Sequence, residues 1–392
     1  MIAPSSALRN LKPTAVNAIL AEMRVLQSQG RDISSLMRGE PDFPTPPHII
    51  DAAGDAMRGG RTRYPDNRGE PRLREAVAAK LHRDNGMVYD ADTEILVTTG
   101  ATLGIYSALT AIVGDGDEVL VPDPIYDAYA SPIALAGGRL RSVRASVEGS
   151  RFALSAAAIE AALTPASRVL LLNTPWNPVG TVFRESELGD IADLVIKRNL
   201  MLISDEIYEA ITYDGARHVS PAALSPEVRA RTVVVNSLSK TYAMTGWRVG
   251  YCAAPAPIVS AMLLVLQQSS RGPATFVQDA AAAALSGPQA CVDAMRIEYA
   301  RRREQVCTAL DNLPRVRVMP PEGGFFAMVN IGELGVESNE VRRRLLHDHG
   351  VAVVHGAAYG GGGEGTLRVS FGSGGDALTR GLERLRKGLQ SL

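Results

Sequence analysis

The sequence contains few cysteines, no excess of charge of either sign and no long apolar run. Its three cysteines, Cys252, Cys291 and Cys307, show no paired spacing, which argues against a disulfide framework and fits a reducing compartment. Forty-one basic and 42 acidic residues leave a formal net charge of −1, so no overall field attracts nucleic acid or an anionic membrane. No apolar stretch approaches the roughly 20 residues that span a bilayer, and the N-terminus lacks the pattern of a leader. We therefore expect a cytoplasmic protein whose partners are small molecules or another copy of itself.

The composition is that of an ordinary globular protein. With 392 residues, 46% of them apolar and 21% charged, the chain is long enough to form two substantial cores. Between residues 94 and 253, short β-rich runs alternate with helical patterns, which predicts an α/β fold with a mostly parallel sheet covered by helices on both faces. The expected strands are residues 94–98, 118–122, 139–144, 168–173, 201–205, 232–236 and 249–253.

The remaining chain predicts a smaller α+β part. Residues 258–268 and 289–313 are expected helices, followed by strand candidates at 323–331, 351–354 and 367–371. The run Gly360 to Gly363 is most simply a flexible loop tip, or a mobile flap near a substrate. His347 and His349 end a basic helical stretch without a third ligand cluster, so we expect a solvated helix end and no metal site.

Lys240 is the most informative residue of the sequence. It lies in the run SLSKTYAMTGWR, residues 237–248, where small hydroxyls surround the amine and Arg248 follows at short range. A lysine amine forms a Schiff base with a carbonyl compound, and this surrounding suits an aldehyde cofactor that carries a phosphate. Taken alone, Lys240 also fits a surface lysine after a strand. The whole run, however, resembles the cofactor-lysine signature of the class I/II pyridoxal-phosphate-dependent aminotransferases.

Asp205 closes an expected strand and begins the motif Asp205-Glu206-Ile207-Tyr208. A buried aspartate costs desolvation free energy unless it is paired, and the protonated ring nitrogen of the cofactor is a suitable partner. The alternative for Asp205 is a helix N-cap after the strand. The motif resembles the aspartate-x-x-tyrosine element of the family, and the resemblance implies that Tyr208 hydrogen-bonds the ring hydroxyl.

Asn177 lies in the run NTPWNPVG, residues 173–180, which resembles the asparagine element of the same family. The resemblance implies that Asn177 donates to the same ring oxygen, and two donors would stabilise the oxygen as an anion. Val179 departs from the threonine that is common at this place. The alternative is that these Asn, Pro and Gly residues simply form a turn. Both interpretations can hold, because such a turn can orient the Asn177 side chain.

A phosphate site is expected where the first strand of the sheet meets the next helix. Gly100, Ala101 and Thr102 open this apolar helix, whose N-terminal N–H groups would face an anion. This signal is weak alone, because small residues are common at such turns. The resemblance adds Ser237 and Arg248 as phosphate contacts, and a guanidinium makes two-pronged bonds to phosphate.

Two tyrosines complete the expected cofactor site. Tyr126 lies where the family places an aromatic ring stacked on the cofactor, and it also fits a tyrosine packed in the core. Tyr64 resembles the tyrosine that family members send across a dimer interface to the neighbour's phosphate. The resemblance therefore implies a homodimer with composite active sites.

The candidates for substrate binding are Arg368, Gly39 and Arg271. An amino acid and its 2-oxo acid share a carboxylate, and Arg368 would bind that group in both halves of a transamination. Arg368 also fits an arginine on the exposed face of a strand. Gly39 and Asn177 match family positions that approach the substrate, and a glycine permits close approach. Arg271 either reads an acidic side chain in the neighbour's site or is an ordinary surface arginine.

The resemblance covers essentially the whole chain and implies the fold of the aspartate aminotransferase superfamily. Residues 46–279 would form the large cofactor-binding domain, and residues 1–45 with 280–392 the small substrate-closing domain. Lys240 would carry pyridoxal 5'-phosphate and move a proton during transfer of an amino group from an L-amino acid to a 2-oxo acid. Aspartate or another acidic or broad-range donor with 2-oxoglutarate is the expected pairing. A lyase or decarboxylase on the same scaffold, or a non-catalytic sensor domain, remains an alternative.

Overall fold

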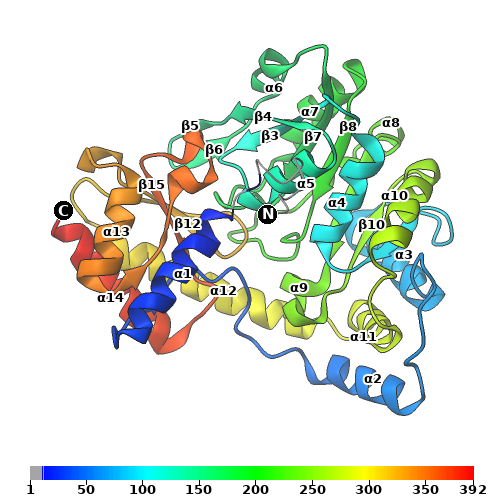
Figure 1. Cartoon of the computed structure of the whole chain (residues 1–392), viewed down its shortest axis with the longest axis horizontal. Helices are drawn as coiled ribbons and strands as arrows, with labels where there is room; N and C mark the ends of the chain where they lie inside the picture. Colours follow the sequence, from blue (N-terminus) through cyan, green and yellow to red (C-terminus); the bar gives the residue numbers. More distant parts are fainter. Residues whose placement is uncertain (1–10, 12) are drawn as a thin grey trace, which may run out of the picture.

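A seven-stranded sheet forms the centre of the larger part of the molecule (Figure 1). The computed structural model describes residues 11 and 13–392. Within these residues the strand order is β2-β10-β9-β8-β7-β3-β4, and β10 runs antiparallel to both of its neighbours while the other pairs are parallel. The strands are β2 (Ile95–Thr98), β3 (Glu118–Asp123), β4 (Arg139–Arg144), β7 (Ser167–Asn173), β8 (Met201–Asp205), β9 (Thr232–Ser237) and β10 (Gly250–Ala253).

Helices cover both faces of this sheet because the side chains on each face are apolar. On β7, Val169 and Leu171 pack into one apolar cluster, and Leu170 and Leu172 pack into another. The first cluster includes residues of α4 (Ala101–Ile112), α5 (Ala130–Leu135) and α10 (Ala256–Ser269). The opposite face is covered by α6 (Ala156–Ala162), α7 (Glu185–Lys197), α2 (Pro47–Arg58), α3 (Pro71–Asn85) and α11 (Thr275–Ser286).

A second, antiparallel sheet lies at the other end of the molecule, in the order β11-β12-β15-β14. Figure 1 shows α13 and α14 beside this sheet and the long helix α12 running from below it toward α9. Early and late parts of the chain meet here, because β1 pairs in parallel with β13. The elements are α1 (Ala15–Ser28), β1 (Ser34–Ser35), α12 (Ala290–Leu310), β11 (Arg317–Met319), β12 (Phe326–Asn330), α13 (Ser338–His349), β13 (Val351–Ala352), β14 (Val354–His355), β15 (Thr366–Ser370) and α14 (Gly375–Gln390).

Short elements connect these layers. They are the hairpin β5 (Ser146–Glu148) and β6 (Arg151–Ala153), the helices α8 (Pro226–Arg229) and α9 (Leu238–Thr241), and 3₁₀ turns at Asp127–Tyr129, Pro221–Ala223, Thr245–Trp247, Gly332–Leu334, Gly356–Tyr359 and Gly361–Gly363. In the part of the chain that the structure describes, every helix is too short or too polar to cross a membrane.

The predicted α/β fold is confirmed, and all seven expected strands belong to the one large sheet. The expected helices correspond to α10 and α12. The candidate strand at 351–354 is divided, since β13 joins β1 and β14 joins β15. The predicted boundary between residues 279 and 280 falls inside α11, and the division into two domains stays a prediction.

The glycine run at 360–363 is only partly a loop tip, because Gly361 is exposed while Gly360 and Gly362 pack against the end of β3. Gly362 donates its backbone N–H to the Asp123 carboxylate at 3.0 Å, and a Cβ on Gly360 would lie 2.4 Å from the same oxygen. Side chains at these positions would collide with the end of β3. The glycines therefore allow this segment to pack against the large sheet.

Candidate active site

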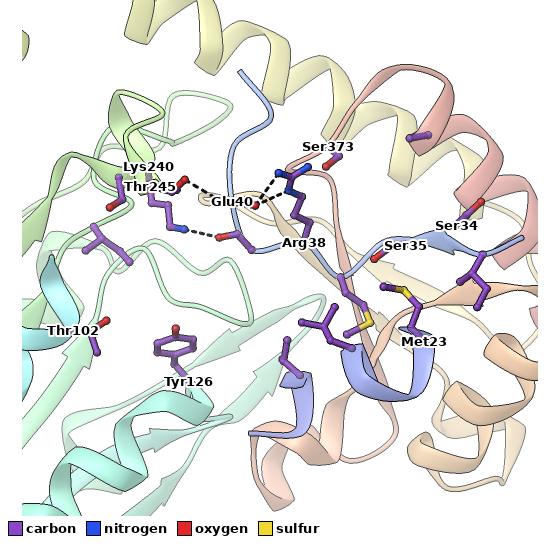
Figure 2. A pocket seen from close by; sticks show the side chains of 18 of the residues that line it. Met23, Ser34, Ser35, Arg38, Glu40, Thr102, Tyr126, Lys240, Thr245 and Ser373 are labelled. Carbon is purple, nitrogen blue, oxygen red and sulfur yellow. Dashed lines mark hydrogen bonds and ion pairs between the residues drawn. The ribbon is translucent and has the colours of Figure 1, made fainter. Parts of the chain in front are cut away.

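A cavity of about 760 Å³ lies at the carboxyl edge of the large sheet, where α/β folds place their ligands. Figure 2 shows Lys240, Thr102 and Tyr126 on one side of it and Arg38 with Glu40 on the other. The predicted site residues that line the cavity are Gly39, Ala101, Thr102, Tyr126, Ser237, Lys240 and Arg248. Segments far apart in the sequence thus meet around one amine.

Lys240 is held in this cavity by α9, the short helix that Ser237 caps. The Ser237 hydroxyl accepts the backbone N–H of Ser239 at 3.1 Å, which fixes the start of the helix. The Lys240 amine donates to the backbone carbonyl oxygen of Gly39 at 2.5 Å. Burial lowers the pKa of Lys240 to about 8, against the attraction of Glu40 and with the help of the Arg248 charge. A larger share of Lys240 is therefore neutral and nucleophilic near neutral pH than of an exposed lysine.

This lowered pKa predicts how the Lys240 amine reacts with an aldehyde such as the expected pyridoxal phosphate. Only the neutral amine attacks a carbonyl carbon, so the uptake rate should rise with pH and reach half of its maximum near pH 8. An unshifted lysine would reach that point near pH 10.5. Stopped-flow absorbance across pH 6 to 11, with a free lysine derivative as reference, measures the difference. A rate that shows no inflection before pH 10 would contradict the buried environment of Lys240.

Asp205 lies at the end of β8 and is only 2% exposed. It accepts the hydroxyl of Tyr129 at 2.6 Å and the backbone N–H of Ile207 at 3.3 Å. Burial raises the pKa of Asp205 to about 6 even though both hydrogen bonds oppose the shift. The carboxylate is thus largely ionised at neutral pH in an apolar place, which is a suitable setting for pairing with a cationic nitrogen.

Tyr129 is a site residue that the sequence reasoning missed. Its ring lies edge-on to Tyr126, with 5.2 Å between ring centroids, and its hydroxyl reaches Asp205. Tyr126 lines the cavity, as predicted, and burial raises the pKa of its hydroxyl to about 12. The sequence did contain a signal for Tyr129: it follows Tyr126 by three residues in one turn, which places both rings near the end of β3.

Arg368 and Asn177 are brought together in the interior. Arg368 on β15 is 3% exposed and donates to the side-chain oxygen of Asn177 at 3.3 Å and to the backbone oxygen of Met37 at 3.2 Å. Among the described residues its Nε has no partner. Because a buried guanidinium rarely leaves a donor unused, this donor set suits a carboxylate ligand. The alternative of an arginine on the exposed face of a strand is wrong.

Asn177 also depends on its surroundings. Its backbone N–H donates to the Asn173 side chain at 2.6 Å, which fixes the turn. Val179, where the family commonly has threonine, is buried in the apolar cluster with Trp176 and Phe183. In the described part of the chain, the Asn177 amide nitrogen and the Tyr208 hydroxyl form no hydrogen bond. Both donors remain available for a ring oxygen.

The expected phosphate contacts converge at the start of α4. Gly100 caps this helix with φ of 77° and without a side-chain hydrogen bond, so the first N–H groups remain available. A Cβ on Gly100 would lie 2.5 Å from an Arg248 nitrogen, so glycine lets the guanidinium approach the helix end. Arg248 itself has φ of 54° and donates to the Thr245 carbonyl at 3.1 Å. Backbone N–H groups, a guanidinium and the Ser237 hydroxyl together suit a phosphate.

Tyr64 and Arg271 lie outside this cavity. Tyr64 is 83% exposed, and the Arg271 guanidinium is stacked over its ring at 5.2 Å. Neither side chain lines the cavity of its own chain. Their predicted roles in a neighbour's site therefore stay predictions.

A buried polar network supports α9 from behind and was also missed. Asn236 accepts the Ser237 backbone N–H at 2.7 Å and donates to the Glu209 carboxylate at 2.7 Å. Glu209 in turn forms a salt bridge with Lys80, and the opposite charge of Lys80 helps to lower the pKa of Glu209 against the effect of burial. Glu209, Glu206 and His218 lie close enough to hold a metal ion. Lys80, Asn236, Ser204 and Ser220 already bind the carboxylate oxygens, so we assign this cluster a structural role.

The residues present fit pyridoxal 5'-phosphate. Lys240 and the helix end that suits a phosphate line the cavity, whereas Asp205, Asn177, Tyr208 and Arg368 are buried outside its lining. The charges of Asp205 and Arg368 still act on the pKa of Lys240, and a partly neutral amine with a buried carboxylate and two available donors suits this cofactor. The Nε of Arg368, buried and without a partner among the described residues, is a donor that suits a carboxylate. Fold and donor set thus define an enzyme that acts on amino acids with this cofactor.

Comparison with known proteins identifies the family. Residues 31–385 match the family model for aminotransferase class I and II. An aspartate aminotransferase of Bacillus sp. strain YM-2 is 36% identical, and the match covers 97% of each chain. The aromatic-amino-acid aminotransferase 2 of Thermococcus litoralis is 40% identical over 91% of this chain and 92% of that one. The crystal structure of an aspartate aminotransferase from Rhizobium meliloti superimposes with a TM-score of 0.96 at 33% identity, covering 99% of both chains.

The chain belongs to the class I and II aminotransferase family. It is a pyridoxal-phosphate-dependent transferase that moves an amino group from an amino acid to a 2-oxo acid. The predicted family, fold, reaction and cofactor are confirmed.

Proposed function

We propose that Lys240 both holds the cofactor and carries the proton during amino-group transfer. The observation that supports this most strongly is the placement of its amine in the cavity with a pKa of about 8. When bound, the cofactor supplies an electron sink for the bond broken at the substrate α-carbon. A group with a pKa near the working pH is effective both as base and as acid, so Lys240 suits a proton that leaves one carbon and returns to another.

The other residues hold and orient the reactants in this proposal. Asp205 keeps a negative charge beside the ring nitrogen, and Tyr129 holds that carboxylate in place through a 2.6 Å hydrogen bond. Tyr208 and Asn177 donate to the ring oxygen. Gly100, Ala101, Thr102, Ser237 and Arg248 bind the phosphate. Tyr126 stacks on the ring face.

Arg368 binds the α-carboxylate of both the amino acid and the 2-oxo acid. Its buried guanidinium has one donor without a partner among the described residues, and two others hold it in position through Asn177 and Met37. Gly39 presents its backbone to the substrate beside Lys240. A shared binding site for one carboxylate explains how a single pocket serves two different reactants.

The donor is an L-amino acid of the acidic or broad-range class, with 2-oxoglutarate as acceptor. Relatives named for aspartate and for aromatic amino acids support this range. The working unit is a homodimer in which Tyr64 reaches the neighbour's phosphate and Arg271 accompanies it. The exposed position of the stacked pair supports this role. The three free cysteines support a cytoplasmic location.

Product analysis with a panel of amino acids tests the proposal. We expect aspartate to produce its 2-oxo acid over many turnovers only when 2-oxoglutarate accepts the amino group, and glutamate only when a different 2-oxo acid does, with one 2-oxo acid formed for each amino group accepted. Without an acceptor, each site should form at most one equivalent. Alanine serves as the uncharged comparison. Release of ammonia or carbon dioxide without an acceptor would contradict transamination and favour a lyase or decarboxylase.

A further inference from the structure

The lining of the same cavity extends from the predicted cofactor residues to residues of α1 and of the start of α14. We call this part the outer chamber; it is lined by Val16, Leu20, Met23, Met37, Arg38 and Arg380. Figure 2 shows Met23 on α1 at its far side and Arg38 between it and Lys240. Its floor is apolar, because the residues of α1 and Met37 pack in one hydrophobic cluster.

Arg38 stands at the entrance to the outer chamber. It directly precedes Gly39, whose carbonyl accepts the Lys240 amine, so its side chain begins beside the reacting centre. Two of its nitrogens contact the same Glu40 oxygen at 2.8 Å, and the other Glu40 oxygen accepts the Thr245 hydroxyl at 3.1 Å. The side chain is 54% exposed, and its Nη1 has no partner among the described residues. Glu40 thus orients the guanidinium and leaves donors free.

Arg380 places a second cation in the same chamber. Within residues 11 and 13–392 its guanidinium forms neither a salt bridge nor a hydrogen bond. Asp32, an acidic residue that also lines the cavity, forms its salt bridge with Arg384 and not with Arg380. Arg380 is an exposed residue of α14 whose guanidinium remains available at the cavity, which suits a carboxylate.

We infer that Arg38 and Arg380 determine specificity for amino acids whose side chain has an apolar stretch ending in a carboxylate. This inference rests on the proposed function, because Arg368 must hold the α-carboxylate for the side chain to enter the outer chamber. Methylene groups would lie against Met37 and α1, while the distal carboxylate meets the arginines. In this inference the distal carboxylate is bound by residues of the chain that also contributes Lys240, and no contact from Arg271 of a neighbouring copy is needed.

Matched pairs of donors test this directly. The terminal carboxylate of 2-aminoadipate is replaced by a methyl group in norleucine, and glutamate and norvaline form the shorter pair. For the wild type we expect kcat/KM to favour 2-aminoadipate over norleucine. Arg380→Met and Arg38→Met should each reduce this ratio by about tenfold to a hundredfold, since each removes a charged hydrogen bond. The control Arg317→Met, at an exposed position of β11, should leave the ratio unchanged.

A binding measurement supplements the rates. Calorimetric titration of the cofactor-loaded protein with hexanedioate and with hexanoate should show the same loss of preference in the Arg380→Met variant. Ratios within twofold of the wild type in both arginine variants would overturn the inference while leaving the proposed function intact. If the wild type converts none of these donors and aspartate also fails, the proposed function falls together with it.

Discussion

Replacing Lys240 with alanine is expected to abolish turnover. The change removes both the amine that holds the cofactor and the group that moves the proton. General acid–base catalysis alone contributes about 10²- to 10⁴-fold, so we expect kcat to fall by at least about 10³-fold. Steady-state measurement of 2-oxo acid formation, with the protein saturated in pyridoxal phosphate, gives the value.

Lys197→Ala is the matched control for this variant. Lys197 lies at the end of α7, with its side chain 65% exposed and paired with Glu160 on the surface. Its loss should leave kcat unchanged. Addition of a small primary amine should restore part of the lost activity in the Lys240→Ala variant, because the cavity left by the side chain lies beside the reaction. Full activity of Lys240→Ala without added amine would refute the assigned role.

Asp205→Asn is expected to lower kcat by about 10²- to 10³-fold, the cost of removing one preorganised electrostatic group. Asparagine has nearly the same shape, so the fold is retained and the lost quantity is the negative charge. The Tyr129 hydroxyl can still donate to the amide oxygen, which keeps the side chain in place. Loss of charge should also weaken retention of the cofactor, measured by dialysis and visible absorbance.

The exposed Asp193 on α7 gives the comparison for Asp205. Asp193→Asn removes the same charge from the surface and should change neither kcat nor cofactor retention. An Asp205→Asn variant with wild-type kcat would mean that the carboxylate does not serve the ring nitrogen.

Periodicity and strand ends were enough to predict the large sheet. The β7 and β8 sequences are continuous apolar runs, and only strands covered on both faces bury such runs in an α/β fold. Asp205 followed from the same reasoning, because it ends a strand at the carboxyl edge, whereas Ser237 came from the family resemblance. The roles of Arg368 and Asn177, by contrast, came from the family resemblance.

Features that depend on long-range contacts escaped prediction. Tyr129 reaches Asp205 across 76 positions of sequence, and Glu209 meets Lys80 across 129. The glycines at 360–363 suggested a loop tip, although the small size of Gly360 and Gly362 allows close packing on Asp123. Such roles depend on which surfaces meet after folding, and a local sequence pattern does not predict these contacts.

The measurement that tests the central claim most directly is chemical mapping of the cofactor attachment. Borohydride reduction of the protein loaded with pyridoxal phosphate converts a lysine linkage into a stable secondary amine. Proteolysis and mass spectrometry then locate the modified residue. We predict one modified lysine per chain, Lys240, in the peptide that contains Tyr242 and Met244. Modification of another lysine, or none at saturating cofactor, would contradict the account of this site.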